Sequence, residues 1–203
     1  MTYFVTSNNS SSYSIVSLDV RSCAVAVSTT QCETTQDEPT FISPFITSTP
    51  PYVIIFGCFQ YQSSNYTLYI LDEQLELLYD IPITSDSYPT FSTYAHSLIS
   101  VTRKYNTNQT NITSFDLANN GAVNWSKVAF NGNPEGFALD GEGKMYIVEA
   151  DVATSLEMAL YLFSSDGTQL DNTPWGTNRS FSTLSLGTGE ILLESLLCLA
   201  SIT

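Results

Sequence analysis

The sequence predicts an all-β protein assembled from repeated, four-stranded antiparallel sheets. Short apolar runs recur along the chain and are separated by turns rich in Gly, Pro, Asn and Asp. Asp-Gly pairs lie between some of these runs, where they indicate hairpin turns. Two further markers recur about every 44–53 residues. Together these observations favour a regular array of sheets over a mixed α/β fold.

The clearest unit of the array lies between residues 133 and 170. Its apolar runs predict three strands joined by hairpins, at Phe137–Leu139, Met145–Val148 and Leu160–Phe163. The connecting turns contain Asp140-Gly141 and Asp166-Gly167, for which we expect type I′ geometry, because both residue types tolerate positive φ.

The remaining units contain weaker copies of this pattern. In chain order we expect strands at 3–5, 13–20, 24–27, 41–47, 52–60, 66–71, 75–83, 90–94, 97–103, 112–117, 123–130, 181–186 and 190–202. Two segments have a helical alternative, 155–160 and 190–200. In the second, which would be a short C-terminal helix, Leu192, Leu193, Leu196, Leu197 and Ala200 share one broad apolar face.

Two independent markers define the length of the repeat. Phe41, Phe91, Phe137 and Phe181 fall in the first strand of each unit, at spacings of 50, 46 and 44. Asp19, Asp72, Asp116 and Asp166 end the third strand, at spacings of 53, 44 and 50. Four hairpin-connected strands per period is typical of a β-propeller blade.

The expected blades number about four to five, with partial blades at both termini. We treat residues 1–203 as a single β-propeller-like domain. Three closures stay open: a small ring in which the terminal strands share a blade, a fragment of a longer propeller, and completion by strand addition from neighbouring chains.

The unit at 133–170 resembles blades of the NHL and SMP-30/strictosidine-synthase-like propellers. The matching residues are Pro134-Glu135-Gly136, the Asp140–Gly143 hairpin, Lys144–Val148 and Glu149-Ala150-Asp151. The resemblance covers roughly 38 of the 203 residues. Such families include lactonases, other hydrolases and non-catalytic scaffolds, so the resemblance implies an architecture more directly than an activity.

Three carboxylates of this unit are the candidate metal ligands. Glu135, Glu149 and Asp151 lie at strand ends, and Ca²⁺ prefers several carboxylate and carbonyl oxygens. The resemblance implies a metal held by acidic residues from several blades; the alternative is that these three are solvated turn residues. No catalytic residues are assigned, because the lone His96 has no Gly-x-Ser-x-Gly nucleophile elbow to serve.

The charge pattern excludes several partners. The chain has 20 acidic and 6 basic residues, for a net charge of −14. The cations are scattered, whereas nucleic-acid binding and attraction to anionic membranes both need clustered Lys and Arg. The apolar run Ile191–Ala200 is too short and too interrupted to span a bilayer.

Sequons and cysteines indicate an extracellular or cell-surface protein. Seven Asn-x-Ser/Thr sequons occur in a chain of 27 Ser and 24 Thr, at Asn8, Asn9, Asn65, Asn108, Asn111, Asn124 and Asn178. The cysteines Cys23, Cys32, Cys58 and Cys198 allow three disulfide pairings, with reduced buried thiols as the alternative. No signal peptide is visible at the N-terminus, so either the protein is cytosolic or the natural chain begins upstream. We favour the second alternative, because it accounts for the sequons and the cysteines.

Three functions follow from these observations as hypotheses. The first is an extracellular, glycosylated β-propeller that acts as a structural or interaction module, self-assembling into a surface filament or coat. Its partners would be proteins, including copies of itself, and glycans. The second is a metal-dependent hydrolase of the SMP-30/lactonase kind, with Ca²⁺ as its cofactor. The third is a lectin-like carbohydrate binder.

Overall fold

The described part of the chain is almost entirely β-strand. The computed structural model describes the backbone of residues 2–9, 12–18, 25–31, 45–46, 54–60, 65–72, 74–86, 89–150, 158–176, 181–186 and 191–195. Side chains are described at 55, 57, 66–72, 74–86, 89–149 and 158–174. Within these ranges no helix is long and apolar enough to cross a membrane.

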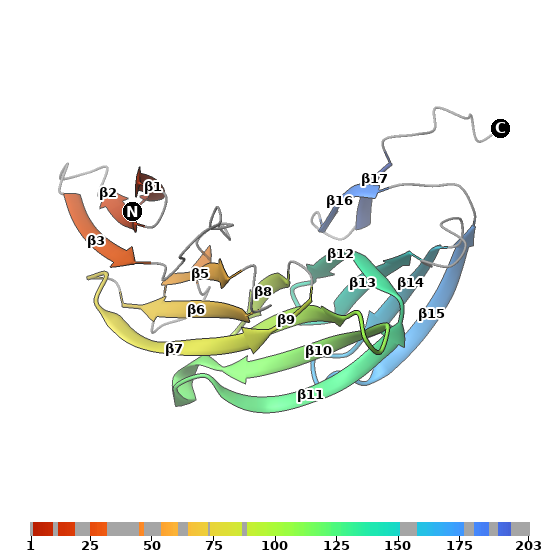
Figure 1. The fold of residues 1–203 in the computed structure, drawn as a ribbon. Helices are drawn as coiled ribbons and strands as arrows, with labels where there is room; N and C mark the ends of the chain where they lie inside the picture. The colour runs from red at the N-terminus through yellow and green to blue at the C-terminus, as the bar shows by residue number, and fades with distance from the viewer. Residues whose placement is uncertain are drawn as a thin grey trace. The chain divides into compact units, whose positions relative to one another are not determined.

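The strands form five successive antiparallel sheets, drawn in Figure 1. The first sheet contains β1 (Thr2–Asn9), β2 (Ser12–Leu18) and β3 (Val25–Gln31). The second contains β4 (Phe45–Ile46), β5 (Ile54–Gln60), β6 (Asn65–Leu71) and β7 (Leu77–Thr84). The third contains β8 (Thr90–Tyr94), β9 (Ser97–Lys104), β10 (Gln109–Asp116) and β11 (Ala122–Asn131), with the 3₁₀ helix η1 (Leu117–Asn119) before β11.

The fourth sheet contains β12 (Asn133–Leu139), β13 (Met145–Ala150), β14 (Met158–Phe163) and β15 (Gln169–Gly176). The fifth contains β16 (Phe181–Leu186) and β17 (Ile191–Ser195). In every sheet, strands that follow each other in sequence are neighbours. The expected array of three complete four-stranded units between two partial ones is therefore confirmed.

The expected helical alternatives are wrong where the structure describes them. Ile191–Ser195 is strand β17, which pairs with β16 through Leu186↔Ile191 and Ser185↔Leu192. Met158–Leu160 likewise belongs to β14. Leu192 and Leu193 of the expected apolar helix face therefore lie in a strand. Residues 151–157 and 196–203 lie outside the described part.

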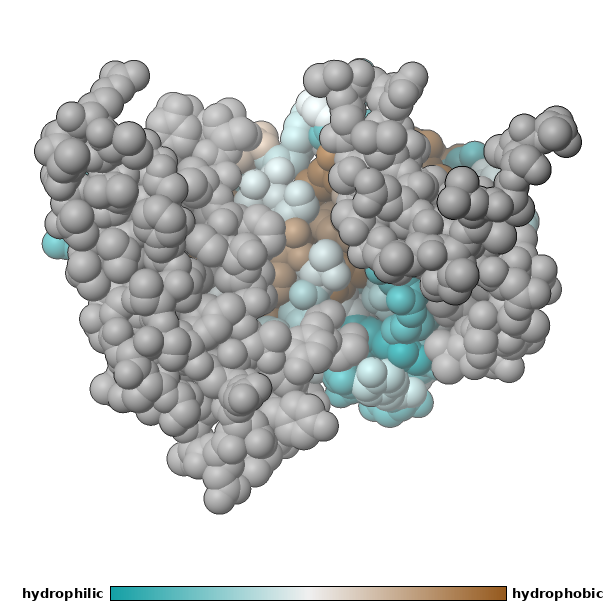
Figure 2. Space-filling view, turned by 90° about the horizontal axis from the view of Figure 1, so that it is seen from above, coloured by the Kyte–Doolittle hydropathy of each residue, from teal (hydrophilic) through white to brown (hydrophobic). Residues whose placement is uncertain are grey.

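Period-two alternation places the core side chains. In β10, Thr110, Ile112 and Ser114 are buried, while the residues between them are partly exposed. In β7, Ile81 and Ile83 are buried between exposed neighbours. Successive strand residues point to opposite faces of a sheet, so one face of each of these strands packs inward. In Figure 2, brown apolar residues of the described surface lie beside teal polar ones.

The chain divides into two compact units. One comprises residues 1–86, 95–97 and 116–122, and the other comprises 87–94, 98–115 and 123–203. The first unit has a core of Tyr66, Leu68 and Ile70 from β6, all at most 1% exposed, together with Ile81 and Ile83. Burial of these apolar side chains is the main favourable contribution to the stability of this unit.

The second unit has a core built from its own strands. Ile99 and Val101 of β9 pack with Ile112 of β10 and with Met145 and Ile147 of β13. Aromatic rings complete the cluster: Phe130 stacks on Tyr161 with ring centroids 4.5 Å apart. Of the Phe markers of the repeat, Phe91 and Phe137 are buried, as their place in the first strand of a unit predicts. Phe41 lies outside the described residues.

Three hairpin turns share one hydrogen-bonded design. Each turn begins at a residue with an oxygen in its side chain: Asp72, Asp140 or Ser164. The backbone carbonyl of this first residue accepts a hydrogen bond from the amide of the residue three positions later. Its backbone amide donates to the carbonyl of the residue four positions later. Their side-chain oxygens also accept from the amide of that fourth residue. The residue at the third step has positive φ: Leu75 at 66°, Gly143 at 78° and Gly167 at 75°.

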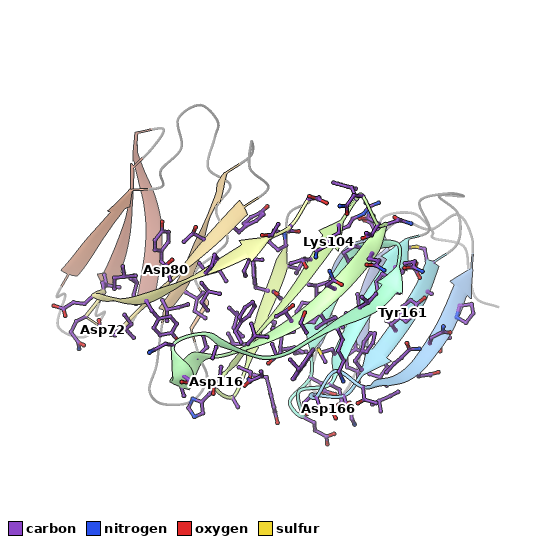
Figure 3. The ribbon with its side chains drawn as sticks, turned by 60° about the horizontal axis from the view of Figure 1, so that its bottom comes forward. Asp72, Asp80, Lys104, Asp116, Tyr161 and Asp166 are labelled. Atoms are coloured by element: carbon purple, nitrogen blue, oxygen red, sulfur yellow. The ribbon has the colours of Figure 1, made fainter. Side chains whose placement is uncertain are left out.

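This design corrects the expected type I′ turns. The positive φ falls on Gly143 and Gly167, whereas Gly141, Asp140 and Asp166 have ordinary negative φ. A type I turn followed by a left-handed residue is the usual three-residue hairpin loop. Of the Asp markers expected to end third strands, Asp116 is the last residue of β10 and Asp72 directly follows β6 (Figure 3). Asp166 instead lies three residues after the end of β14, in the β14–β15 turn. Asp19 lies outside the described residues.

Candidate functional site: the Arg103 cluster

Antiparallel strand order brings three connections to one end of the second unit. The β9–β10 turn (105–108), the β11–β12 link at Gly132 and the end of β13 all lie there. The hairpin turns at 140–144 and 164–168 lie at the opposite end of their strands. Figure 3 shows this separation, with Lys104 at one end and Asp166 at the other. We call the polar residues at the first end the Arg103 cluster: Arg103, Tyr105, Asn108, Thr110, Gly132, Asn133, Glu135, Glu149 and Tyr161.

Arg103 is the centre of this cluster. Its side chain is 7% exposed, and it follows Ile99 and Val101 on the inward face of β9. The guanidinium donates from Nη1 to Asn133 Oδ1 at 2.6 Å and from Nη2 to Asn108 Oδ1 at 3.3 Å. Its Cζ also lies 4.3 Å from the centroid of the Tyr105 ring. A buried cation needs such partners, because leaving it unpaired costs several kcal/mol.

The β9–β10 turn places two exposed side chains beside Arg103. The amide of Asn108 donates to the carbonyl of Tyr105 at 3.2 Å, and Asn108 has a φ of 50°. Asn is among the residues that adopt this left-handed conformation most readily. The Tyr105 side chain is 55% exposed although its ring lies against the guanidinium. The turn therefore exposes an aromatic ring and an amide to solvent, and both contact the buried guanidinium of Arg103.

Asn133 links the arginine to a carboxylate. Its Oδ1 accepts from Arg103, and its Nδ2 donates to Glu135 Oε1 at 2.6 Å. Glu135 is the extra residue of a bulge in β12, since the register passes from Pro134↔Glu149 directly to Gly136↔Val148. A bulge redirects a side chain from the regular alternation, and here the Glu135 side chain is exposed.

Glu149 lies on β13 near the backbone link between β11 and β12. Tyr161 donates its hydroxyl to Glu149 Oε2 at 2.7 Å. Burial, this hydrogen bond and the carboxylate charge together raise the pKa of Tyr161 to about 12. A Cβ at Gly132 would overlap the Glu149 carboxyl group, so a larger residue at this position would require the Glu149 side chain to move. The Gly132 carbonyl accepts from the buried Thr110 hydroxyl at 2.8 Å.

The proposed metal ligands are only partly brought together. Glu135 and Glu149 occupy neighbouring positions on paired strands, but Asp151 lies outside the described residues. In the described part, no three His, Cys, Asp or Glu side chains are grouped as a metal site would need. Ca²⁺ takes six to eight oxygens, so these two carboxylates alone do not fit it. The resemblance-based ligand set stays a prediction.

The described sequons occupy different local structures. Asn108 is exposed in the β9–β10 turn, whereas Asn111 is partly buried within β10, where a loop was expected. Asn124 is exposed on β11, and its Nδ2 is 3.5 Å from Ser114 Oγ. For Asn8 and Asn9 at the end of β1, and Asn65 at the start of β6, only the backbone is described. Asn178 lies outside the described residues.

The predicted disulfides stay predictions. Cys58 lies in β5 with its side chain outside the described part, and Cys23, Cys32 and Cys198 are outside it altogether. His96 is exposed in the β8–β9 turn, where its carbonyl accepts from the Leu117 amide at 2.8 Å.

Sequence reasoning missed the centre of the cluster. Arg103, Tyr105, Asn133 and Tyr161 belong to no motif that the sequence displays. One signal existed: alternation along β9 places Arg103 on the same face as Ile99 and Val101, where a cation is unusual. A charged residue in the register of the core indicates either a buried pair or a strand end.

Comparisons with known proteins identify the class of fold. No protein-family model matches the sequence, and no curated protein matches it either. Among solved structures, the Dos1 propeller superposes with a TM-score of 0.58 at 10% identity, covering 95% of this chain and 49% of that chain. A subtype N11 neuraminidase-like protein (H18N11, flat-faced bat, Peru) superposes with a TM-score of 0.50 at 12% identity, covering 85% and 59%.

These likenesses, with the strand order of the described sheets, show a β-propeller fold built of four-stranded antiparallel blades. The chain spans about half of the Dos1 propeller chain and about three fifths of the neuraminidase-like chain. At 10–12% identity the likeness concerns the fold alone. The likeness assigns no function, so a functional proposal has to rest on the surface residues of this chain.

Proposed function

We propose that this β-propeller is an extracellular interaction module that associates with protein partners, including copies of itself, through the outer strands of its blades. Among the described residues, six large hydrophobic side chains are more than half exposed, and five of the six lie on outer strands. They are Leu77 and Leu78 on β7, Val123 and Val128 on β11, and Leu170 on β15, all between 51% and 59% exposed.

The outer position of these strands supports association through sheet edges. β7, β11 and β15 each end the strand order of their described sheets. An outer strand has backbone donors and acceptors on one side that can pair with an added strand. Apolar side chains on such a strand add buried area to the main-chain hydrogen bonds when a partner is present.

β11 is the least protected of the three edges. Proteins blunt edges with charges and prolines. β7 contains Asp80 and Pro82, and β15 contains Asp171 and Pro174. β11 is ten residues long, contains no proline, and has Lys127 as its single charge. The proposal therefore assigns self-association to β11 first.

Self-association through β11 predicts that Val128→Lys lowers the oligomer fraction. A second charge on the edge should weaken an apolar contact by about tenfold or more in Kd, because Val128 is 54% exposed and would be desolvated on pairing. Sedimentation velocity at increasing protein concentration measures this. Asn119→Lys, an equal change of charge at an exposed residue of η1, is the matched control and should leave the association unchanged.

A wild-type protein that stays monomeric across the concentration range would refute association between copies.

A metal-dependent hydrolase related to the NHL/SMP-30-like propellers is the rival function, favoured by the adjacency of Glu135 and Glu149. Under that rival, millimolar Ca²⁺ would raise the thermal midpoint of the wild type, and Glu149→Gln would abolish the rise. Under the module proposal, Ca²⁺ leaves the midpoint unchanged.

A further inference from the structure

The β9–β10 turn combines a sequon with an aromatic ring in one compact loop. Asn108-Gln109-Thr110 is an N-glycosylation acceptor sequence, and Tyr105 precedes Asn108 by three residues. The hydrogen bond from the Asn108 amide to the Tyr105 carbonyl closes the turn between these two residues. The first and last residues of such a turn are close in space.

The side chains of these two residues lie on the same side of the turn. The guanidinium of Arg103 contacts both: its Cζ lies 4.3 Å from the Tyr105 ring centroid, and its Nη2 lies 3.3 Å from Asn108 Oδ1. Arg103 is itself fixed by burial and by its 2.6 Å hydrogen bond to Asn133. Arg103 therefore holds the Tyr105 ring and the Asn108 amide beside each other.

Both groups remain open to solvent at this point. Tyr105 is 55% exposed even with the guanidinium against its ring, and Asn108 is exposed. The bond to Arg103 uses the Oδ1 atom of Asn108, whereas an N-linked sugar is attached through Nδ2. A sugar attached there has an apolar face that can cover an exposed aromatic ring, which removes apolar surface from water.

The two other sequons whose side chains the structure describes lack this arrangement. Asn111 is partly buried inside β10, and the residue three positions before it is Asn108. Asn124 lies on the edge strand β11, and the residue three positions before it is Gly121. Neither position has an aromatic residue three positions before the Asn, as Tyr105 is before Asn108.

We propose that Asn108 is N-glycosylated and that the first N-acetylglucosamine of the glycan packs on the exposed ring of Tyr105, which stabilises the β9–β10 hairpin. The Thr110 hydroxyl is fully buried and donates to the Gly132 carbonyl in the folded state. The complete acceptor sequence, with its Thr110 hydroxyl, is therefore accessible only before the hairpin folds. Attachment to Asn108 therefore occurs during synthesis. The inference rests on the proposed extracellular location for one point, that the chain enters the secretory pathway.

A four-species thermal-melting experiment tests the contact. The full chain and its Tyr105→Ala variant are secreted from a eukaryotic host, and each is melted before and after removal of its N-glycans by an amidase. The amidase converts Asn108 to Asp in both backgrounds, so that change cancels in the comparison. We expect deglycosylation to lower the midpoint by about 2–4 °C more in the wild type than in Tyr105→Ala.

Two control variants define the source of the effect. Tyr105→Phe keeps the ring and should keep the full loss on deglycosylation. Asn124→Gln removes a sequon that has no aromatic residue three positions before it and should leave the difference between wild type and Tyr105→Ala unchanged. Glycopeptide mass spectrometry of the secreted chain should find Asn108 occupied.

An unmodified Asn108 peptide from the secretory host would overturn the proposal, and so would equal midpoint losses in the wild type and in Tyr105→Ala. Failure of the proposed extracellular function is recognised separately. In that case protein from its natural source would carry no glycan, while the chain secreted from the heterologous host would still show the Tyr105-dependent loss.

Discussion

Arg103 shows how a single buried charge can organise one end of a blade. Its guanidinium joins the β9–β10 turn, through Asn108, to the start of β12, through Asn133. Hydrogen bonds to charged groups contribute about 1.5–3 kcal/mol each, and loss of the guanidinium removes two of them. The residue is therefore expected to matter more for stability than any of the exposed cations of the chain.

Replacement of Arg103 by methionine should lower the free energy of unfolding by about 2–3 kcal/mol, because Asn108 and Asn133 lose a charged donor. Lys104→Met removes the same charge from the adjacent exposed residue and should change it by less than about 0.5 kcal/mol. Urea unfolding of both variants measures the difference. Equal effects would contradict a structural role for the Arg103 contacts.

Asp166 provides a pH-dependent contribution at the opposite end. Hydrogen bonds from the Ser164 hydroxyl and the Thr168 amide hold the pKa of Asp166 at about 2, below its ordinary value of 3.8. The folded state therefore favours the ionised carboxylate. This contribution is complete above about pH 4 and is lost as the pH falls toward 2.

The variant Asp166→Asn removes this titration. The thermal midpoint of the wild type should exceed that of Asp166→Asn at pH 6, and the gap should narrow as the pH is lowered from about 4 to 2. Differential scanning calorimetry at matched ionic strength follows the gap. Because the carboxylate is fully exposed, high salt should reduce the gap as well. A gap that is constant with pH would show that the charge plays no part.

At the scale of the element, the hairpin turns depend on one left-handed residue each. In the β12–β13 turn this residue is Gly143, with a φ of 78°, and a Cβ there would meet Tyr94 Cδ1 at 2.6 Å. Gly141 in the same turn has negative φ, and a Cβ there would have no neighbour within 4 Å. Two glycines two residues apart thus have different roles.

Alanine substitution should separate these two glycines. Gly143→Ala should destabilise the protein by about 1–3 kcal/mol through backbone strain and overlap with the Tyr94 ring. Gly141→Ala should be neutral or slightly stabilising, because it restricts only the unfolded chain. Chemical denaturation of the pair is the measurement. The type I′ turn expected from the sequence makes the opposite prediction for Gly141, so the experiment also tests the turn assignment.

The sequence was sufficient for the strands but less so for the turns and the cluster. Apolar runs located β8 (Thr90–Tyr94) and β16 (Phe181–Leu186) at their observed bounds, since strand signals are local. Leu75 was expected in a strand but lies in a turn at positive φ, where its side chain is 3% exposed. The gain from burying Leu75 outweighs the backbone cost, and this balance depends on tertiary packing that the sequence does not display.

At the scale of the whole molecule, the order and size of the sheets followed from the repeat. Phe91, Phe137 and Phe181 lie in the first strand of their sheets, and the apolar runs recur in step with them, so a period of 44–53 residues was enough to define three complete blades. The Arg103 cluster was not predictable in this way. Its members come from five strands and two connections, and they meet only when neighbouring blades pack.

The turns at Asp72, Asp140 and Ser164 have a consequence for how this protein can be recognised. No position of these turns has the same residue in all three copies, since the sequences are Asp-Glu-Gln-Leu-Glu, Asp-Gly-Glu-Gly-Lys and Ser-Ser-Asp-Gly-Thr. The three turns nevertheless form the same backbone hydrogen bonds. One oxygen-bearing side chain and one residue tolerant of the left-handed conformation are sufficient for closure. Copies of a blade can therefore diverge in sequence while the backbone geometry of their turns is kept.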